Sequence, residues 1–204
     1  MTDFDRYHLA LGYAAELHRG QIRKGSGIPY LTHLMSVSAL VLEYGGSDTQ
    51  AIAALLHDAI EDRADGHGGP SVLAEEIERL FGHEVIRLVQ ACTDAGRVQE
   101  PDWRTRRWTS LRRLQGCDAG TALILAADKL HNTRCLLADH RTHGDALFAR
   151  FEAGKADVLW YLEAAAVLLE RHHPGPISNE LQRTVSALQR QCSAPPVPRV
   201  LRRA

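Results

Sequence analysis

A chain of 204 residues, 45% hydrophobic and 24% charged, is long enough for one sizeable core and has the composition of an ordinary globular protein. Its formal net charge of −1 gives no overall electrostatic reason to bind nucleic acid or a membrane, so neither partner is expected. There is no apolar leader, no run of about 18 apolar residues and no Cys-x-x-Cys motif among four scattered cysteines, so we expect a cytoplasmic protein.

Apolar residues recur with a helical period along almost all of the chain, and no stretch alternates like a strand, so an all-α fold is expected. Gly and Pro residues divide the pattern into a single helical bundle of about eight to ten helices. We expect one domain over residues 1–192 and a disordered Pro- and Arg-rich tail over residues 193–204. In chain order, the predicted helices cover residues 5–18, 30–44, 51–62, 71–82, 83–92, 103–114, 121–137, 143–172 and 176–191.

A Gly-rich loop, residues 20–29, separates the first two predicted helices and carries Arg23 and Lys24. Glycine makes such a loop flexible, so these two basic side chains could close on a phosphate. The simpler interpretation is a solvated pair of surface charges, and the loop alone does not decide between them.

The third predicted helix, which Asp48 is expected to cap, changes character along its length. Residues 51–56 are all apolar and favour a buried helix. Buried carboxylates are costly unless they are paired or bind a metal, so continued burial of this helix predicts a polar cleft. The ionisable residues that follow the apolar run are His57, Asp58, Glu61 and Asp62.

A second apolar run, residues 122–127, leads into Asp128, and His33 lies near the start of the second predicted helix. Together with His57 and Asp58, they form a nitrogen and oxygen ligand set that suits manganese, iron, zinc or nickel better than calcium. Taken singly, His33 is more often a surface or capping residue and Asp128 a salt-bridge residue. The prediction of a metal site therefore depends on the ordered set.

That order of residues resembles the HD superfamily of metal-dependent phosphohydrolases, and several motifs resemble its RelA/SpoT-type hydrolase branch. The resemblance runs from about residue 4 to residue 170, and no synthetase or regulatory domain follows. The chain is thus similar to the stand-alone small alarmone hydrolases, such as the metazoan SpoT homologues. The matching motifs are Arg23-Lys24-x-x-x-x-Pro29-Tyr30-x-x-His33, Leu55-Leu56-His57-Asp58-x-x-Glu61-Asp62, Val89-x-x-x-Thr93-Asp94 and Ala127-Asp128-Lys129-Leu130-x-Asn132.

The resemblance implies an HD-domain bundle that removes pyrophosphate from the ribose 3′ position of ppGpp or pppGpp and leaves GDP or GTP. A small guanosine nucleotide is therefore the implied partner, and one manganese ion, or another divalent transition metal, is the implied cofactor. The implied metal ligands are His33, His57, Asp58 and Asp128.

The resemblance also assigns roles around the metal. Glu61 and Asp62 would orient and deprotonate the attacking water without binding the metal, which agrees with the ability of a carboxylate to act as a general base. Arg23 and Lys24 would hold substrate phosphates, and Asn132 would contact the nucleotide.

Two residues nearer the C-terminus, Arg150 and Tyr161, resemble a segment of bacterial small alarmone hydrolases in which an Arg-Phe-Asn run precedes a Trp-Tyr pair near the nucleotide. Glu152 stands where the Asn would be, which weakens the match. An aromatic stripe at this spacing is also typical of a core. Both interpretations, substrate contact and core packing, stay open.

Rival functions remain compatible with the same residues. Another HD phosphohydrolase could act on NADPH or a deoxynucleoside phosphate, and a metal-containing nucleotide sensor would not turn substrate over. Glu61 and Asp62 argue against the sensor, because a binding module needs no water-activating pair. The Arg-rich helix predicted at residues 103–114 could bind single-stranded nucleic acid, but a solvated face or the rim of an anion pocket fits the acidic net charge better.

Overall fold

The computed structural model describes residues 3–93 and 102–193, and within these ranges every regular element is a helix, as predicted. The one β-type pairing in this part of the chain is an isolated bridge between Ile22 and Pro29. The α-helices are α1 (Asp3–Leu17), α2 (Leu31–Glu43), α3 (Asp48–Leu56), α4 (Ala59–Arg63), α5 (Pro70–Phe81), α6 (His83–Cys92), α7 (Trp103–Gly116), α8 (Ala119–His143), α9 (Lys155–His172) and α10 (Pro176–Ser193), and two 3₁₀-helices are η1 (Ala64–His67) and η2 (Gly144–Arg150).

The predicted C-terminal tail and Asp94 lie outside the described residues, so the domain limit at residue 192 stays a prediction. None of the helices in the described part of the chain is both long enough and apolar enough to cross a bilayer.

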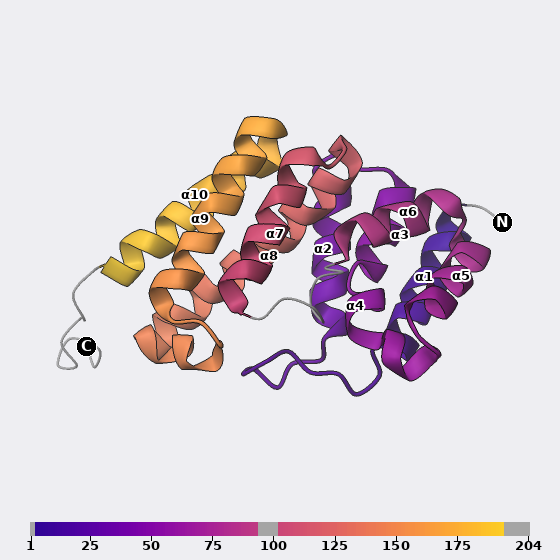
Figure 1. The fold of residues 1–204 in the computed structure, drawn as a ribbon, viewed down its shortest axis with the longest axis horizontal. Coiled ribbons are helices and arrows are strands. Elements are labelled where there is room, and N and C mark those ends of the chain that lie inside the picture. The colour runs from indigo at the N-terminus through magenta and orange to yellow at the C-terminus, as the bar shows by residue number, and fades with distance from the viewer. Residues whose placement is uncertain (1–2, 94–101, 194–204) are drawn as a thin grey trace.

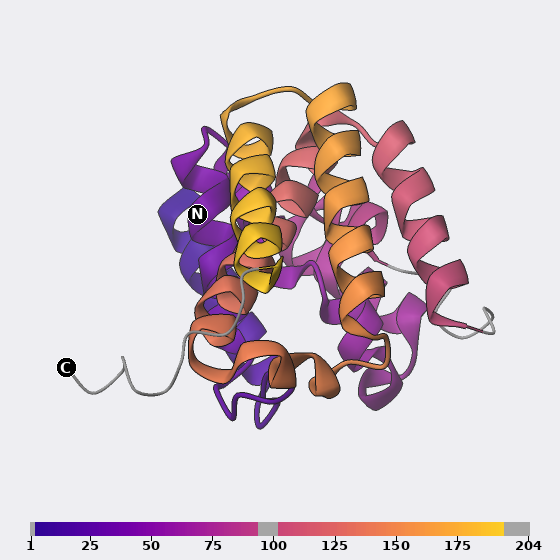
Figure 2. The same cartoon turned by 90° about the vertical axis from the view of Figure 1, so that its left-hand side faces the viewer.

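Helix α8 joins two halves of the bundle (Figure 1). On one side it packs against α2, α3 and α6, and on the other against α9 and α10. Figure 2 shows α7, α9 and α10 side by side, with α9 in contact with both of its neighbours. A residue on α8 can therefore meet residues from both halves of the chain, and this arrangement positions the site.

Helix α3 is the buried element that the apolar run predicted, and residues 51–56 are all fully buried. Its N-cap is Ser47, which forms a capping box with Gln50, so the prediction that Asp48 caps this helix is wrong. A serine hydroxyl accepts a hydrogen bond from the backbone N–H of the third helical residue as well as a carboxylate does. The side chain of Gln50 in turn accepts a hydrogen bond from the backbone N–H of Ser47.

The prediction of one continuous helix through residue 62 is also wrong, because α3 ends at Leu56 and α4 begins at Ala59. Asp58 takes φ −97° and ψ 0°, at the edge of the right-handed helical region and close to the bridge region, where active-site residues are common. The imidazole Nδ1 of His57 hydrogen-bonds the backbone oxygen of Ala54 at 2.8 Å, and such side-chain bonds compete with the helical pattern. His57 and Asp58 consequently lie at a corner between two helices.

The predicted helix over residues 143–172 is interrupted. Helix α8 ends at His143, and its C-cap is Gly144, whose positive φ of 58° is a backbone conformation that glycine adopts without strain. The chain then forms η2, which buries Leu147 and Phe148, and α9 begins only after Gly154. The interruption places Arg150 beside the loop between α1 and α2, in contact with Gly25.

Candidate metal centre and its cavity

Four side chains from α2, the α3–α4 corner and α8 converge at one point. The Nε2 atom of His33 lies 3.3 Å from Asp128 Oδ1 and 3.7 Å from Asp58 Oδ2. The Nε2 atom of His57 lies 3.1 Å from the same Asp58 oxygen and 4.0 Å from Asp128 Oδ1. The structure therefore brings together all four predicted ligands, and ligand atoms of His33, His57 and Asp58 all lie within 4.8 Å of one another.

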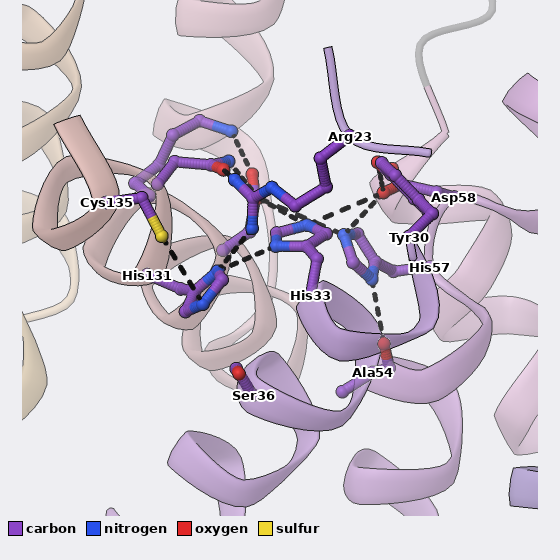
Figure 3. Close-up of polar contacts among 12 residues, drawn as sticks. Arg23, Tyr30, His33, Ser36, Ala54, His57, Asp58, His131 and Cys135 are labelled. Carbon is purple, nitrogen blue, oxygen red and sulfur yellow. Dashed lines mark hydrogen bonds and ion pairs between the residues drawn. The ribbon is translucent and has the colours of Figure 1, made fainter. Parts of the chain in front are cut away.

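Both imidazoles direct Nε2 at the centre of this cluster because their Nδ1 atoms are engaged elsewhere (Figure 3). His57 Nδ1 donates to the oxygen of Ala54, and His33 Nδ1 lies 2.8 Å from Nδ1 of His131. Arg23 donates to that same His131 nitrogen at 3.1 Å, so His131 accepts there and His33 donates. Each ligand histidine then carries its proton on Nδ1 and leaves an Nε2 lone pair facing the carboxylates, as metal ligands require.

The two carboxylates are also held from outside the cluster. Tyr30 donates its hydroxyl to Asp58 Oδ2 at 2.6 Å. Asp128 accepts Lys129 Nζ on Oδ2 and Asn132 Nδ2 on Oδ1, both at 2.5 Å. Hydrogen-bond donors of this kind orient the carboxylates that would coordinate a metal and keep them in the ionised form that a metal binds.

The charges of the cluster favour the binding of a cation at its centre. Burial alone would lower the pKa of His57, but the nearby carboxylates of Asp58 and Asp128 raise that pKa to about 9, so they favour a positive charge at Nε2, which a bound divalent ion would supply in place of the proton. Burial opposes ionisation of Asp128, yet Lys129 and His33 hold its pKa well below the usual value. The Nε2 atom of His57 is buried, and its close polar neighbour is the Asp58 carboxylate at 3.1 Å, to which it makes no well-directed hydrogen bond. Two carboxylates and two imidazole nitrogens that converge on one point fit a divalent ion with mixed nitrogen and oxygen ligands.

The cluster forms one wall of a cavity of about 710 Å³, a volume typical of small-molecule sites. Glu61 lines this cavity, whereas its predicted partner Asp62 is not among the lining residues. Asp62 instead accepts a hydrogen bond from Gln21 Nε2 at 2.8 Å. The predicted substrate-binding residues all line the cavity: Arg23, Lys24, Asn132, Arg150 and Tyr161.

Residues 10–159, most of the chain, match the HD domain family.

The chain belongs to the HD domain family.

The predicted relationship is thus confirmed, and together with the His and Asp cluster it indicates a divalent metal site in this HD domain.

Similar proteins agree with this assignment. A probable guanosine-3′,5′-bis(diphosphate) 3′-pyrophosphohydrolase of Synechocystis sp. is 32% identical over 130 residues, which cover 62% of this chain but only 16% of that protein. The corresponding MESH1 enzyme of Danio rerio is 34% identical over 129 residues, 62% of this chain and 66% of that protein. A solved structure of a metazoan ortholog of SpoT that hydrolyzes ppGpp superposes with a TM-score of 0.68 at 25% identity, covering 92% of this chain and 96% of that one.

Three residues that support the HD-domain cluster have no role in the sequence-based prediction. Tyr30 stands in a matched motif, but nothing in the pattern shows that its hydroxyl reaches Asp58. His131 lies three residues after Asp128, a spacing that places both on one face of a helix and that could have suggested a shared site. Lys129 neutralises Asp128 from the adjacent position.

Proposed function

We propose that this HD domain is a metal-dependent (p)ppGpp 3′-pyrophosphohydrolase that releases pyrophosphate and leaves GDP or GTP. The observation that carries the proposal is the four-residue cluster with its unsatisfied His57 Nε2, set in the wall of a basic, nucleotide-sized cavity. The activity for which the Synechocystis and Danio rerio relatives are named supports the substrate class. All four cysteines lie in the described residues as free thiols, which supports a reducing compartment such as the cytoplasm.

His33, His57, Asp58 and Asp128 would hold one manganese ion, which suits their mixed nitrogen and oxygen donors. When bound, such an ion neutralises phosphate charge and lowers the pKa of water. Lys129 and Asn132 keep the Asp128 carboxylate ionised and oriented, and Tyr30 does the same for Asp58.

Glu61 would accept the proton of the attacking water, because its carboxylate lines the cavity one turn beyond Asp58. Asp62, held by Gln21, would act with it by orienting the water. The pair is thus assigned to proton transfer rather than to metal binding.

Arg23, Lys24 and Arg150 would bind substrate phosphates at the mouth of the cavity. Arg23 Nη2 donates to Asn132 Oδ1 at 2.9 Å, which places the guanidinium beside the residue proposed to contact the nucleotide. Arg150 pairs with Asp139 at 3.0 Å, which helps to hold it beside Gly25 of the loop. We assign Tyr161 to the cavity floor below them, where it is buried.

A substrate panel tests the activity. Purified protein with manganese is expected to release pyrophosphate from ppGpp and pppGpp and to leave NADPH and dGTP largely intact. Turnover of NADPH or dGTP without release from ppGpp would overturn the proposed substrate. Tight ppGpp binding without any turnover would instead indicate a sensor.

Gly25 provides a test of the Arg150 assignment. A β-carbon on Gly25 would lie 2.4 Å from Arg150 Cδ, whereas one on Gly27 would meet nothing within 4 Å. Both glycines have a left-handed φ, +79° and +70°, so Gly25→Ala and Gly27→Ala should both lose about 1 kcal/mol or more of stability.

Only Gly25→Ala should displace Arg150, and its KM for ppGpp should rise roughly tenfold, the effect of one lost charged hydrogen bond. Steady-state kinetics of both variants measure the change in KM, and thermal unfolding measures the loss of stability, so the two effects can be separated. Equal KM values in the two variants would remove Arg150 from the substrate site.

A further inference from the structure

One face of α7 forms part of the cavity wall. Trp103, Arg107 and Ser110 follow one another at helical spacing, and all three line the cavity. The guanidinium carbon of Arg107 lies 4.9 Å from the ring centroid of Tyr161 and 5.5 Å from that of Trp103. The two rings meet edge to face at 6.2 Å, and Ser110 Oγ lies 3.1 Å from the Tyr161 hydroxyl. Arg107 is therefore held by a rigid aromatic support.

Arg107 differs from its neighbours on α7 in what it pairs with. Arg104 pairs with Asp157 at 2.7 Å, and Arg106 pairs with Glu152 at 2.6 Å. Within residues 3–93 and 102–193, no carboxylate pairs with Arg107, and its Nε atom is buried without a hydrogen-bond acceptor. Buried guanidinium donors without acceptors are costly, and stacking on rings leaves the donor edge open for an anion.

The position of Arg107 relative to the metal centre follows from Lys129. The Lys129 ammonium bonds Asp128 and lies 5.9 Å from the centroid of Tyr161, whose ring Arg107 also contacts. Lys129 is neutralised by Asp128, whereas none of the carboxylates in the described residues pairs with Arg107. Arg23 lies elsewhere, on the loop beside His131 and Asn132. The cavity thus has two separate cationic sites, with the metal cluster near both.

Two cationic sites suit a nucleotide with two separate polyphosphate groups. We infer that Arg107, on its support of Trp103 and Tyr161, is the subsite for the 5′-diphosphate of the guanosine substrate, while the 3′-diphosphate lies at the metal cluster. This inference rests on the proposed function for the 3′ end. It adds a residue that discriminates substrates by their 5′ substituent.

Arg107→Met tests the subsite, since methionine keeps an apolar stem against the rings and removes the charge. The matched control is Arg112→Met, which makes the same change at an exposed arginine of α7 that faces an outer groove. By calorimetry with manganese present, GDP should bind Arg107→Met roughly 10- to 100-fold more weakly than wild type, the range for a charged hydrogen bond. Arg112→Met should bind GDP as wild type does, and Arg107→Lys should recover part of the affinity.

Kinetics supply a second measurement that a purely structural role would not affect. Arg107→Met should raise KM for ppGpp by a similar factor but leave unchanged the KM for guanosine 3′-diphosphate, which lacks the 5′ phosphates. An equal loss with both substrates, or unchanged GDP affinity, would overturn the subsite. If wild type binds GDP through Arg107 yet releases no pyrophosphate from ppGpp, the proposed function fails and the subsite stands.

Discussion

Changing Glu61→Gln together with Asp62→Asn is expected to lower kcat for ppGpp roughly 100- to 10,000-fold, the usual contribution of general acid–base catalysis. The amides keep the size and much of the hydrogen bonding of the carboxylates but cannot accept a proton at neutral pH. Metal content, measured by elemental analysis, should stay near that of the wild-type chain. The binding affinity for GDP should change little, because neither residue is assigned to the nucleotide.

The two single substitutions should contribute unequally to the loss of kcat. Glu61 lines the cavity, whereas Asp62 accepts a hydrogen bond from Gln21, so Glu61→Gln should account for most of the loss. Asp65→Asn is the matched control, since Asp65 is an exposed carboxylate on the following 3₁₀-helix. Loss of metal from the double variant would show that these carboxylates are ligands. A nearly normal kcat would remove them from proton transfer.

His57→Ala is expected to lower metal affinity roughly 100-fold or more and to abolish most turnover, because the substitution removes a ligand that no neighbour can replace. Its Nε2 atom is buried at the centre of the cluster, 3.1 Å from Asp58 Oδ2, and the adjacent imidazole of His33 is itself a proposed ligand. At a concentration 100 times the dissociation constant, manganese should stabilise wild type by about 2.7 kcal/mol, and a chelator should reverse this. His57→Ala should show little of that stabilisation.

Two comparisons make the metal test specific. His83→Ala removes an imidazole whose side chain is 80% exposed, and this control should keep both metal and activity. Asp128→Asn should also lose metal, but it leaves the buried Lys129 ammonium without its counter-charge. Asp128→Asn should therefore lose about 3–5 kcal/mol of stability even in the apo-protein. Full manganese occupancy in His57→Ala would contradict the ligand assignment.

The metal cluster was predictable because its residues follow buried helices. The apolar runs before His57 and Asp128 mark elements that must pack in the core, so the polar residues that end those runs had to be compensated there. The helical period also predicted α6 at residues 83–92 without error. A pattern of this kind depends only on which side of a helix is apolar.

Other features depend on contacts between distant segments and left no periodic signal. The corner at Asp58 arises from a side chain that bonds the backbone of its own helix, and local propensity favoured an uninterrupted helix there. The stacking of Arg107 on Tyr161 joins α7 to α9, and sequence spacing across 54 residues does not fix such a contact. The interruption at Gly144 is visible as a glycine, but glycines inside helices are common enough to mislead.

The hydrogen bonds of Arg23 have a thermodynamic consequence. Arg23 bonds both His131, which supports His33, and Asn132, which supports Asp128. The loop proposed to bind phosphate and two proposed metal ligands therefore share one set of hydrogen bonds, and whatever orders one side orders the other. Linkage makes such an effect reciprocal: if metal tightens nucleotide binding by some factor, nucleotide must tighten metal binding by the same factor. With positive coupling, an HD domain built this way would hold its metal least firmly when no nucleotide is present, and its metal content would follow nucleotide supply.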